Sequence, residues 1–119
     1  MKADLSSFHF QVLAVDGYKC MAVVAGIAPA EWATDCVQAH HIDFGRKKRN
    51  NSISNGITLS VRAHYCCHHG GVVGGVYYTA REYITLILRT LLDRGKLNND
   101  HFRWQDGLEK LERKYGNKK

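Results

Sequence analysis

Five residues in the middle of the chain carry side chains that could hold a metal ion or move a proton: His40, His41, Asn55, His64 and His68. His64 and His68 are four positions apart, so on a helix they would share one face and could bind one cation. Two surface histidines at this spacing are an equally ordinary outcome. His40 and His41 would point to opposite faces of a strand, one buried and the other exposed. Asn55 precedes a glycine, and this dipeptide alone is typical of a hairpin turn.

The order and spacing of these residues together are much less expected by chance than any one of them. Asn55 follows His41 by 14 residues, and His64 follows Asn55 by nine. The segment CVQAHHIDFGRKKRNNSISNGITLSVRAHYCCHHG resembles the HNH endonucleases, which belong to the His-Me finger or ββα-metal class. The likeness covers residues 20–70 and is strongest over 40–68. The set of three histidine ligands is similar to that of the nuclease colicins.

This resemblance implies a role for each residue of the group. His41 would be the general base that takes a proton from the water attacking phosphorus, since its ordinary pKa of about 6.5 lies near working pH. His40, His64 and His68 would hold one divalent ion, which would stabilise charge on the phosphate. Asn55 would hold the loop backbone by hydrogen bonds. Imidazole donors suit Zn²⁺, Ni²⁺ or Mn²⁺ better than Mg²⁺, so any of these four ions is a candidate.

Basic residues point to an anionic partner. Lys and Arg number 17 against 11 Asp and Glu, which gives a formal net charge of +6. Nucleic acid is the first expectation and an acidic membrane surface the second, while charge for solubility alone is the plain alternative. Arg62 could clamp the scissile phosphate with two hydrogen bonds. A basic block in the preceding loop is expected to contact phosphates, with a solvated loop as the alternative: Arg46, Lys47, Lys48 and Arg49.

The four cysteines form no CxxC pair. Many HNH proteins carry two such pairs around a structural zinc, so no such zinc is expected here. Cys36, Cys66 and Cys67 are expected to be buried thiols, and Cys20 a core residue. A site built from Cys20, Cys36 and one of the vicinal cysteines is the alternative.

The elements that must position the histidines predict an α+β fold. Alternating apolar residues over 8–15, followed by an apolar run over 18–25, predict an N-terminal β-hairpin. Strands over 36–42 and 57–61 and a helix over 64–69 would form the ββα-metal core, at approximately 36–70. Glycines at 70–71 end this helix, and those at 74–75 are expected to continue a flexible link.

Two helices are expected after that core. Thr79 and Glu82 form a capping box that opens a helix over approximately 79–94, and a last helix is expected over approximately 99–115. The length of 119 residues predicts one domain, and the resemblance implies that it is a single HNH nuclease domain over 1–119.

Length and composition set the remaining expectations. The longest near-apolar run, residues 20–30, is far short of a membrane span, and no signal peptide is evident. A cytosolic or virion-borne protein without a membrane partner is therefore expected. The HNH resemblance implies a cytoplasmic protein of a bacterial or phage-infected cell, with DNA as its partner. Without a separate recognition segment, a homodimer is possible. The alternative function is a non-catalytic HNH-like or zinc-stabilised module that binds nucleic acid without cutting it.

Overall fold

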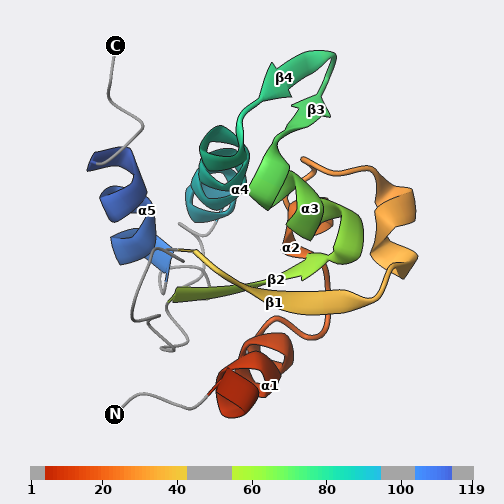
Figure 1. Cartoon of the computed structure of the whole chain (residues 1–119), viewed down its shortest axis with the longest axis vertical. Helices are drawn as coiled ribbons and strands as arrows, with labels where there is room; N and C mark the ends of the chain where they lie inside the picture. The colour runs from red at the N-terminus through yellow and green to blue at the C-terminus, as the bar shows by residue number, and fades with distance from the viewer. Residues whose placement is uncertain (1–4, 43–54, 95–103, 114–119) are drawn as a thin grey trace.

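The computed structural model describes residues 5–42, 55–94 and 104–113 of the chain. They form an α+β fold of helices around two small antiparallel sheets (Figure 1). The elements run in the order α1 (Leu5–Val15), α2 (Met21–Val24), the 3-10 helix η1 (Ala30–Thr34), β1 (Val37–His41), β2 (Gly56–Ser60), α3 (Val61–His69), β3 (Gly71–Val73), β4 (Val76–Tyr78), α4 (Ala80–Arg94) and α5 (Gln105–Leu111).

The strands β1 and β2 pair with each other and lead directly into α3. Their register places His40 opposite Ile57 and His41 opposite Gly56. The Ser60 side chain caps the helix by accepting a hydrogen bond from the Ala63 N–H at 3.1 Å. Because the cap sits at the last residue of β2, α3 begins three residues earlier than its sequence predicts. The predicted strand–strand–helix order is present.

The predicted N-terminal β-hairpin is wrong, because this part of the chain forms α1 and the short helix α2. Phe8 and Val12 are buried, at 1% and 0% exposed, and they lie one helical turn apart. Phe10, which stands between them in the apparent alternation, is 66% exposed, and Val15, the end of the predicted strand, is 53% exposed. The buried residues of this segment therefore lie on one face of a helix, and two of its large apolar residues are exposed on the surface.

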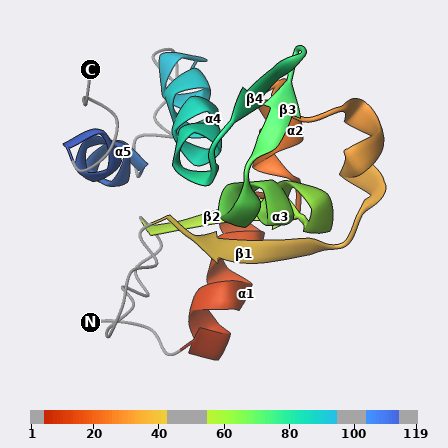
Figure 2. The ribbon, with the colours of Figure 1, turned by 45° about the horizontal axis from the view of Figure 1, so that its top comes forward.

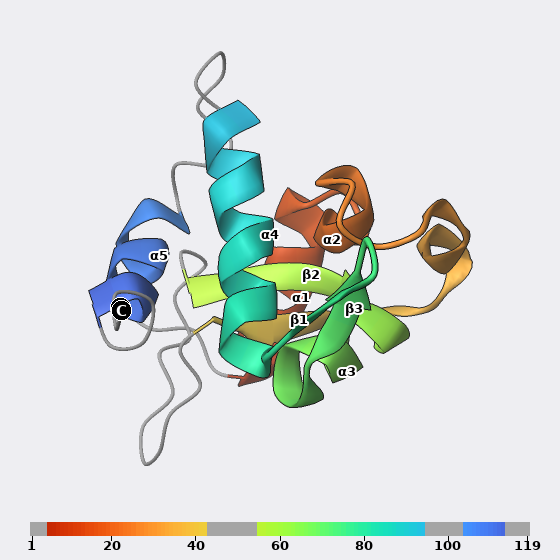
Figure 3. The ribbon, with the colours of Figure 1, turned by 90° about the horizontal axis from the view of Figure 1, so that it is seen from above.

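The two faces of the β1–β2 hairpin are covered by different helices (Figures 2 and 3). On one face α1 packs closely, because Gly56 has no side chain. A Cβ at this position would lie 2.9 Å from ring atoms of Phe8 and would also overlap Val12. The close approach of α1 therefore requires glycine at the start of β2.

The open edge of β2 is closed by two side chains. The buried Thr58 N–H donates to Asp16 Oδ2 at 2.8 Å, which ties the end of α1 to the middle of the strand. The Trp104 Nε1–H donates to the Gly56 carbonyl oxygen at 2.7 Å. These bonds satisfy backbone groups that the two-stranded sheet cannot pair, and they cover an edge that would otherwise be open to another strand.

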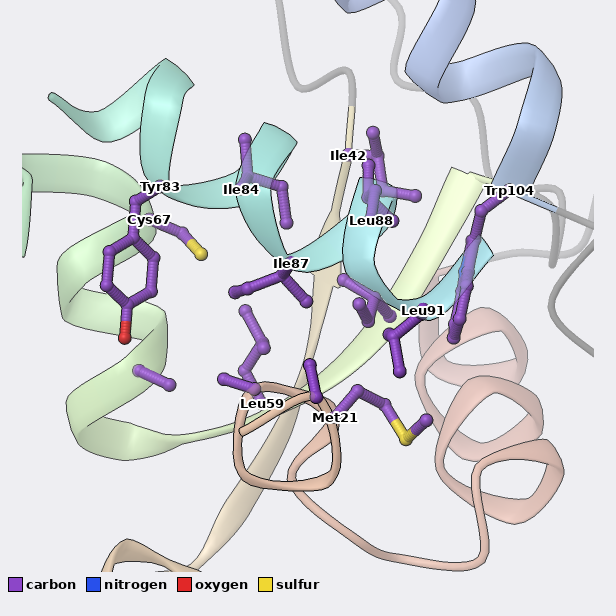
Figure 4. Packing of buried hydrophobic residues seen from close by; sticks show 14 of the residues in the cluster. Met21, Ile42, Leu59, Cys67, Tyr83, Ile84, Ile87, Leu88, Leu91 and Trp104 are labelled. Atoms are coloured by element: carbon purple, nitrogen blue, oxygen red, sulfur yellow. The ribbon is translucent and has the colours of Figure 1, made fainter. Parts of the chain in front are cut away.

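The other face of the hairpin carries the main apolar core (Figure 4). The helix α4 supplies one buried stripe to it, consisting of Tyr83, Ile84, Ile87, Leu88 and Leu91. The predicted capping box opens this helix: the Thr79 N–H donates to Glu82 Oε1 at 2.9 Å, and the Glu82 N–H donates to Thr79 Oγ1 at 3.3 Å. The predicted helix over 79–94 is confirmed within one residue.

Two further differences from the sequence predictions lie in the second half of the chain. Residues 71–78 are not a flexible link but a β-hairpin, whose turn is made by Gly74 and Gly75 at φ values of 58° and 82°. Such left-handed pairs form the tight turns that match the twist of antiparallel strands. The helix α5 begins at Gln105, later than the predicted start at residue 99, and residues 99–103 and 114–115 lie outside the described part. Within the described ranges, no helix has the length and apolar character needed to cross a membrane.

Candidate metal centre

Three imidazole rings converge between β1 and α3. The ring centroids of His40 and His64 are 5.0 Å apart, those of His40 and His68 are 5.0 Å apart, and those of His64 and His68 are 4.8 Å apart. Each ring offers one nitrogen atom, and these atoms all lie within 4.8 Å of one another. Among the described residues this is the group that could hold a metal ion, and it contains all three predicted ligands.

The positions of these rings follow from the local structure. His40 lies next to the end of β1, and its side chain is 1% exposed. His64 and His68 occupy successive turns of α3, so their side chains share the helix face that meets β1. β2 pairs with β1 and leads directly into α3, and this arrangement brings His40 next to His64 and His68.

A neighbouring amide sets the orientation of His64. Its Nδ1 lies 2.6 Å from Oε1 of Gln38, which is two residues before His40 and therefore on the same side of β1. An amide oxygen can only accept, so the Nδ1 of His64 carries the proton and its Nε2 presents a lone pair. That Nε2 is 3.1 Å from the Nε2 of His68. The contact to Gln38 is the kind of outer bond that aligns metal-binding imidazoles.

The residues present fit a divalent transition metal. Zinc–nitrogen bonds of 2.0–2.1 Å in tetrahedral geometry place two ligand nitrogens about 3.3 Å apart. The 3.1 Å between the Nε2 atoms of His64 and His68 is close to that separation. Three imidazoles suit zinc, nickel and copper better than magnesium, which prefers oxygen ligands and water. The group could therefore hold one such ion, with room left for a further ligand.

Burial keeps two of the three histidines in the form that binds metal. Removal from water lowers the pKa of His40 well below its ordinary value, and repulsion from His64 and His68 lowers it further. The pKa of His64 is also lowered, first by burial and then by repulsion from His68. Neutral imidazole is the ligand form, so both side chains are ready to coordinate at neutral pH.

His41 lies on the opposite side of the strand from His40, under α1. Its ring stacks on Phe8, with centroids 4.2 Å apart and planes inclined by 9°. The side chain is 8% exposed, so both histidines of the pair are buried. The expectation that one of them would be exposed is wrong, because α1 covers the face that sequence alone would leave open. The group that could hold a metal does not include His41.

Asn55 is buried at the start of β2, at 5% exposed. Its carbonyl oxygen accepts a hydrogen bond from the Ile42 N–H at 2.8 Å. This bond extends the strand pairing by one step beyond His41 and joins the two ends of the segment between 42 and 55. The backbone of Asn55 thus holds the strand end on which both histidines stand, while the expected role of its side chain stays a prediction.

Arg62 is engaged by an acidic neighbour. Its Nε and Nη2 donate to the two carboxylate oxygens of Asp35 at 2.9 and 2.8 Å, and its guanidinium lies 5.2 Å from the ring centroid of Trp32. Hydrogen bonding to Arg62 lowers the pKa of Asp35. A contact from Arg62 to a phosphate would have to replace this carboxylate. The other predicted phosphate contacts, Arg46, Lys47, Lys48 and Arg49, lie outside the described residues.

Three of the four cysteines are buried, and Cys36 is exposed. The prediction for Cys36 is wrong, because it precedes β1 at the edge of the fold. Burial raises the pKa of Cys67 well above its ordinary value, and the neighbouring thiols Cys66 and Cys20 raise it further. The thiolate form that binds metals is therefore disfavoured in this cluster.

Sequence reasoning missed two residues that contact the histidines. Gln38 could have been found, because residues two apart on a strand share a face and His40 follows it at that spacing. Phe8 gave no such signal, since it lies far from His41 in the sequence and its partner depends on how α1 packs. Comparisons with family models, with curated proteins and with solved structures find no match to this chain.

Proposed function

We propose that this protein is a metal-dependent endonuclease of the HNH type, which hydrolyses phosphodiester bonds in DNA. One observation carries the proposal: three imidazoles from a strand end and the following helix converge on one point, with a fourth imidazole next to them in sequence. The convergence of His40, His64 and His68 is the arrangement that the HNH resemblance implies for the metal ligands. The order of β1, β2 and α3 supports assignment to the ββα-metal class.

Each histidine has a distinct task in this reaction. His40, His64 and His68 hold one divalent ion, for which Zn²⁺, Ni²⁺ and Mn²⁺ are better suited than Mg²⁺. When bound, the ion supplies positive charge that stabilises the phosphate and the leaving 3′ oxygen. His41, as neutral imidazole, accepts a proton from the water whose oxygen forms the new bond to phosphorus. The bond between phosphorus and the 3′ oxygen breaks, and the leaving oxygen takes up a proton from solvent, so that the products are a 5′ phosphate and a 3′ hydroxyl.

The stacked ring of Phe8 supports the assignment of His41 as a positioned base. A face-to-face contact with an inclination of 9° restricts rotation of the imidazole, so its nitrogen atoms keep fixed directions. The cytoplasmic location, the DNA contacts of Arg46 to Arg49 and a homodimer belong to the same proposal. Contacts to the phosphate backbone would make binding weaken with salt.

A non-catalytic nucleic-acid-binding module is the second candidate. It is favoured by one observation, namely that His41 is 8% exposed under α1. A base must reach the water that it activates, and a buried ring offers little access. In this alternative the three-histidine centre stabilises the strand–helix junction, and no bond is cut.

Incubation of supercoiled plasmid with the full chain separates the two candidates. Each of the four divalent ions is tested with and without chelator, using the wild type, His41→Ala and the exposed-site control Lys19→Ala. We expect nicked or linear product from the wild type and the control, and none with chelator or from His41→Ala. If the wild type binds the plasmid but leaves it supercoiled with every ion, the enzyme proposal fails and the binding module stands.

A further inference from the structure

A surface of exposed aromatic rings adjoins the metal centre. Tyr65 is 62% exposed and Tyr77 is 61% exposed, and His69 is also exposed. The rings of Tyr65 and His69 lie against each other, with centroids 4.3 Å apart and planes inclined by 31°. Tyr65 and His69 come from α3, and Tyr77 comes from β4 of the hairpin that leaves the C-terminal end of α3 (Figure 2). We call these three residues the aromatic surface.

The aromatic surface is held in place rather than left loose. The Tyr77 hydroxyl donates to the carbonyl oxygen of His69 at 3.2 Å, across the junction between α3 and the second hairpin. Gly70 allows this contact, because a Cβ there would meet the Tyr77 ring at 2.8 Å and overlap its hydroxyl. The tight turn of the β3–β4 hairpin brings Tyr77 back to the helix. Exposed rings in fixed positions lose little freedom when a flat partner stacks on them.

The aromatic surface lies next to the metal ligands on α3. Tyr65 follows His64 in the sequence and His69 follows His68, so the rings occupy the neighbouring stripe of the same helix. The ring centroids of His68 and His69 are 6.5 Å apart. That spacing is about the length of one nucleotide in an extended strand. A phosphate at the metal centre would therefore place its adjoining base beside the aromatic surface.

The segment that carries the aromatic surface contains no acidic residue that would repel a polyanion. No Asp or Glu occurs between residues 61 and 78, which span α3 and the second hairpin. Asp35, which follows η1, forms an ion pair with Arg62 of α3, so the two charges offset each other. The chain as a whole carries a formal charge of +6. Proteins that bind single-stranded nucleic acid combine positive charge with aromatic side chains on which the bases stack.

We propose that Tyr65, His69 and Tyr77 stack on unpaired bases of a nucleic acid strand, so that this site prefers single-stranded or locally unpaired substrate to intact duplex. Bases in a duplex are already stacked on one another, and their faces are not available to these rings. The position of the base next to the scissile phosphate rests on the proposed function. The stacking itself requires only the surface.

Binding measured without metal tests this proposal. Fluorescence anisotropy in the presence of chelator compares a labelled single-stranded oligonucleotide of about 12 nucleotides, within the usual range of site sizes, with a duplex of the same length. A third ligand is an abasic strand, which keeps every phosphate and lacks the bases. The variants are Tyr65→Leu and Tyr77→Leu, with Phe10→Leu on α1 as the matched control, since Phe10 is 66% exposed. Thermal melting checks that each variant is folded.

We expect the wild type to bind the single strand more tightly than the duplex or the abasic strand. Tyr65→Leu should weaken single-strand binding by at least about fivefold, the lower end of the effect of one stacked ring, and leave abasic binding unchanged. Phe10→Leu should change neither. Tyr77→Phe should retain most of the single-strand affinity, because it keeps the ring.

The stacking proposal would be overturned if the wild type bound the single strand and the duplex with equal affinity. It would also be overturned if Tyr65→Leu weakened binding to the abasic strand as much as binding to the normal single strand. Wild-type protein that binds no single strand at all would overturn it too. Because no cleavage is needed, these outcomes are independent of the plasmid experiment. If the protein cuts plasmid but Tyr65→Leu does not change its affinity for the single strand, the proposed function stands and the stacking proposal fails.

Discussion

The Phe8 ring lies flat against the His41 imidazole, with centroids 4.2 Å apart and planes 9° from parallel. This contact joins α1 to the strand end that carries the three-histidine centre. Since Phe8 is 1% exposed and Val12 is fully buried beside Gly56, the helix cannot shift without disturbing the histidine. The N-terminal helix is therefore part of the candidate site and not an appendage to it.

The first prediction concerns the proposed base. His41→Ala should reduce plasmid cleavage to background, because the other imidazoles of the candidate site, His40, His64 and His68, form the metal-binding group on the opposite side of β1. Zn²⁺ or Ni²⁺ binding, measured by calorimetry, should stay near the wild-type value, since His41 is outside the metal-binding group. Cleavage within about tenfold of wild type would show that another group accepts the proton, given that general-base catalysis contributes about 10²–10⁴-fold.

Gly56→Ala should destabilise the protein by about 1–3 kcal/mol in urea unfolding, because the added methyl group overlaps Phe8 and Val12. A matched control comes from the same exchange in α5. A Cβ at Gly107 would meet Ile42 at 3.4 Å, an ordinary contact, and alanine is the better helix former. Gly107→Ala should therefore stabilise the protein by up to about 1 kcal/mol. Equal effects of the two exchanges would contradict the close packing of α1.

The bond between Asp16 and Thr58 predicts a further loss of stability. Asp16→Ala removes the acceptor of the Thr58 N–H, which is fully buried. An unsatisfied buried donor costs about 1–3 kcal/mol, and the free energy of unfolding should fall by that amount. Asp93→Ala, at an exposed position on α4, is the control and should change stability by less than about 0.5 kcal/mol. Matching losses in both variants would mean that the edge of β2 is closed in another way.

Local patterns explain what the sequence could predict. The pair His64 and His68 follows from helical spacing, and the start of α4 follows from Thr79 and Glu82, whose side chains bond within one turn. Each prediction needs only neighbours in the chain. The three-histidine group could be anticipated because β2 pairs with β1 and leads directly into α3, which brings the end of β1 next to a face of that helix.

The failures have a physical cause in tertiary packing. Residues four apart lie on one face of both a strand and a helix, so the spacing of Phe8 and Val12 fits either element. Phe10, which is exposed on α1, made the apolar pattern look like the alternation of a strand. The partner of Arg62 is 27 positions away, and that of His64 is 26 positions away. The Arg62 contact depends on how the elements pack, which composition and spacing do not encode, whereas the strand spacing from Gln38 to His40 was available in the sequence.

Gln38 provides a test of the metal centre that leaves its ligands intact. Gln38→Leu removes the acceptor that fixes His64, and the affinity for Zn²⁺ should fall by about 10–100-fold. Gln38→Glu keeps an acceptor and should retain most of the affinity. His64→Ala should abolish high-affinity binding. Calorimetric titration with Zn²⁺ ranks the affinities of the three variants and the wild type. If Gln38→Leu binds Zn²⁺ as tightly as the wild type, Gln38 does not contribute to the metal site.

The lowered pKa values of His40 and His64 predict how stability depends on pH in the absence of metal. In the unfolded chain both side chains titrate near 6.5, whereas burial holds the folded pKa values lower. Below about pH 6.5 the unfolded state therefore binds more protons than the folded state, and the free energy of unfolding falls as the pH drops. Above that pH both states are neutral at these positions, so these two groups add no slope.

Urea unfolding in chelator at several pH values between about 5 and 8 measures this slope. We expect His40→Gln, which removes the more deeply buried group, to flatten the curve below pH 6.5 relative to the wild type. Added Zn²⁺ should stabilise the wild type most at neutral pH and less as the pH falls, because protons and the ion compete for the same nitrogens. A wild-type curve that is flat between pH 5 and 7 would mean that His40 is protonated as readily in the folded protein as in the unfolded chain, and the buried neutral centre would have to be abandoned.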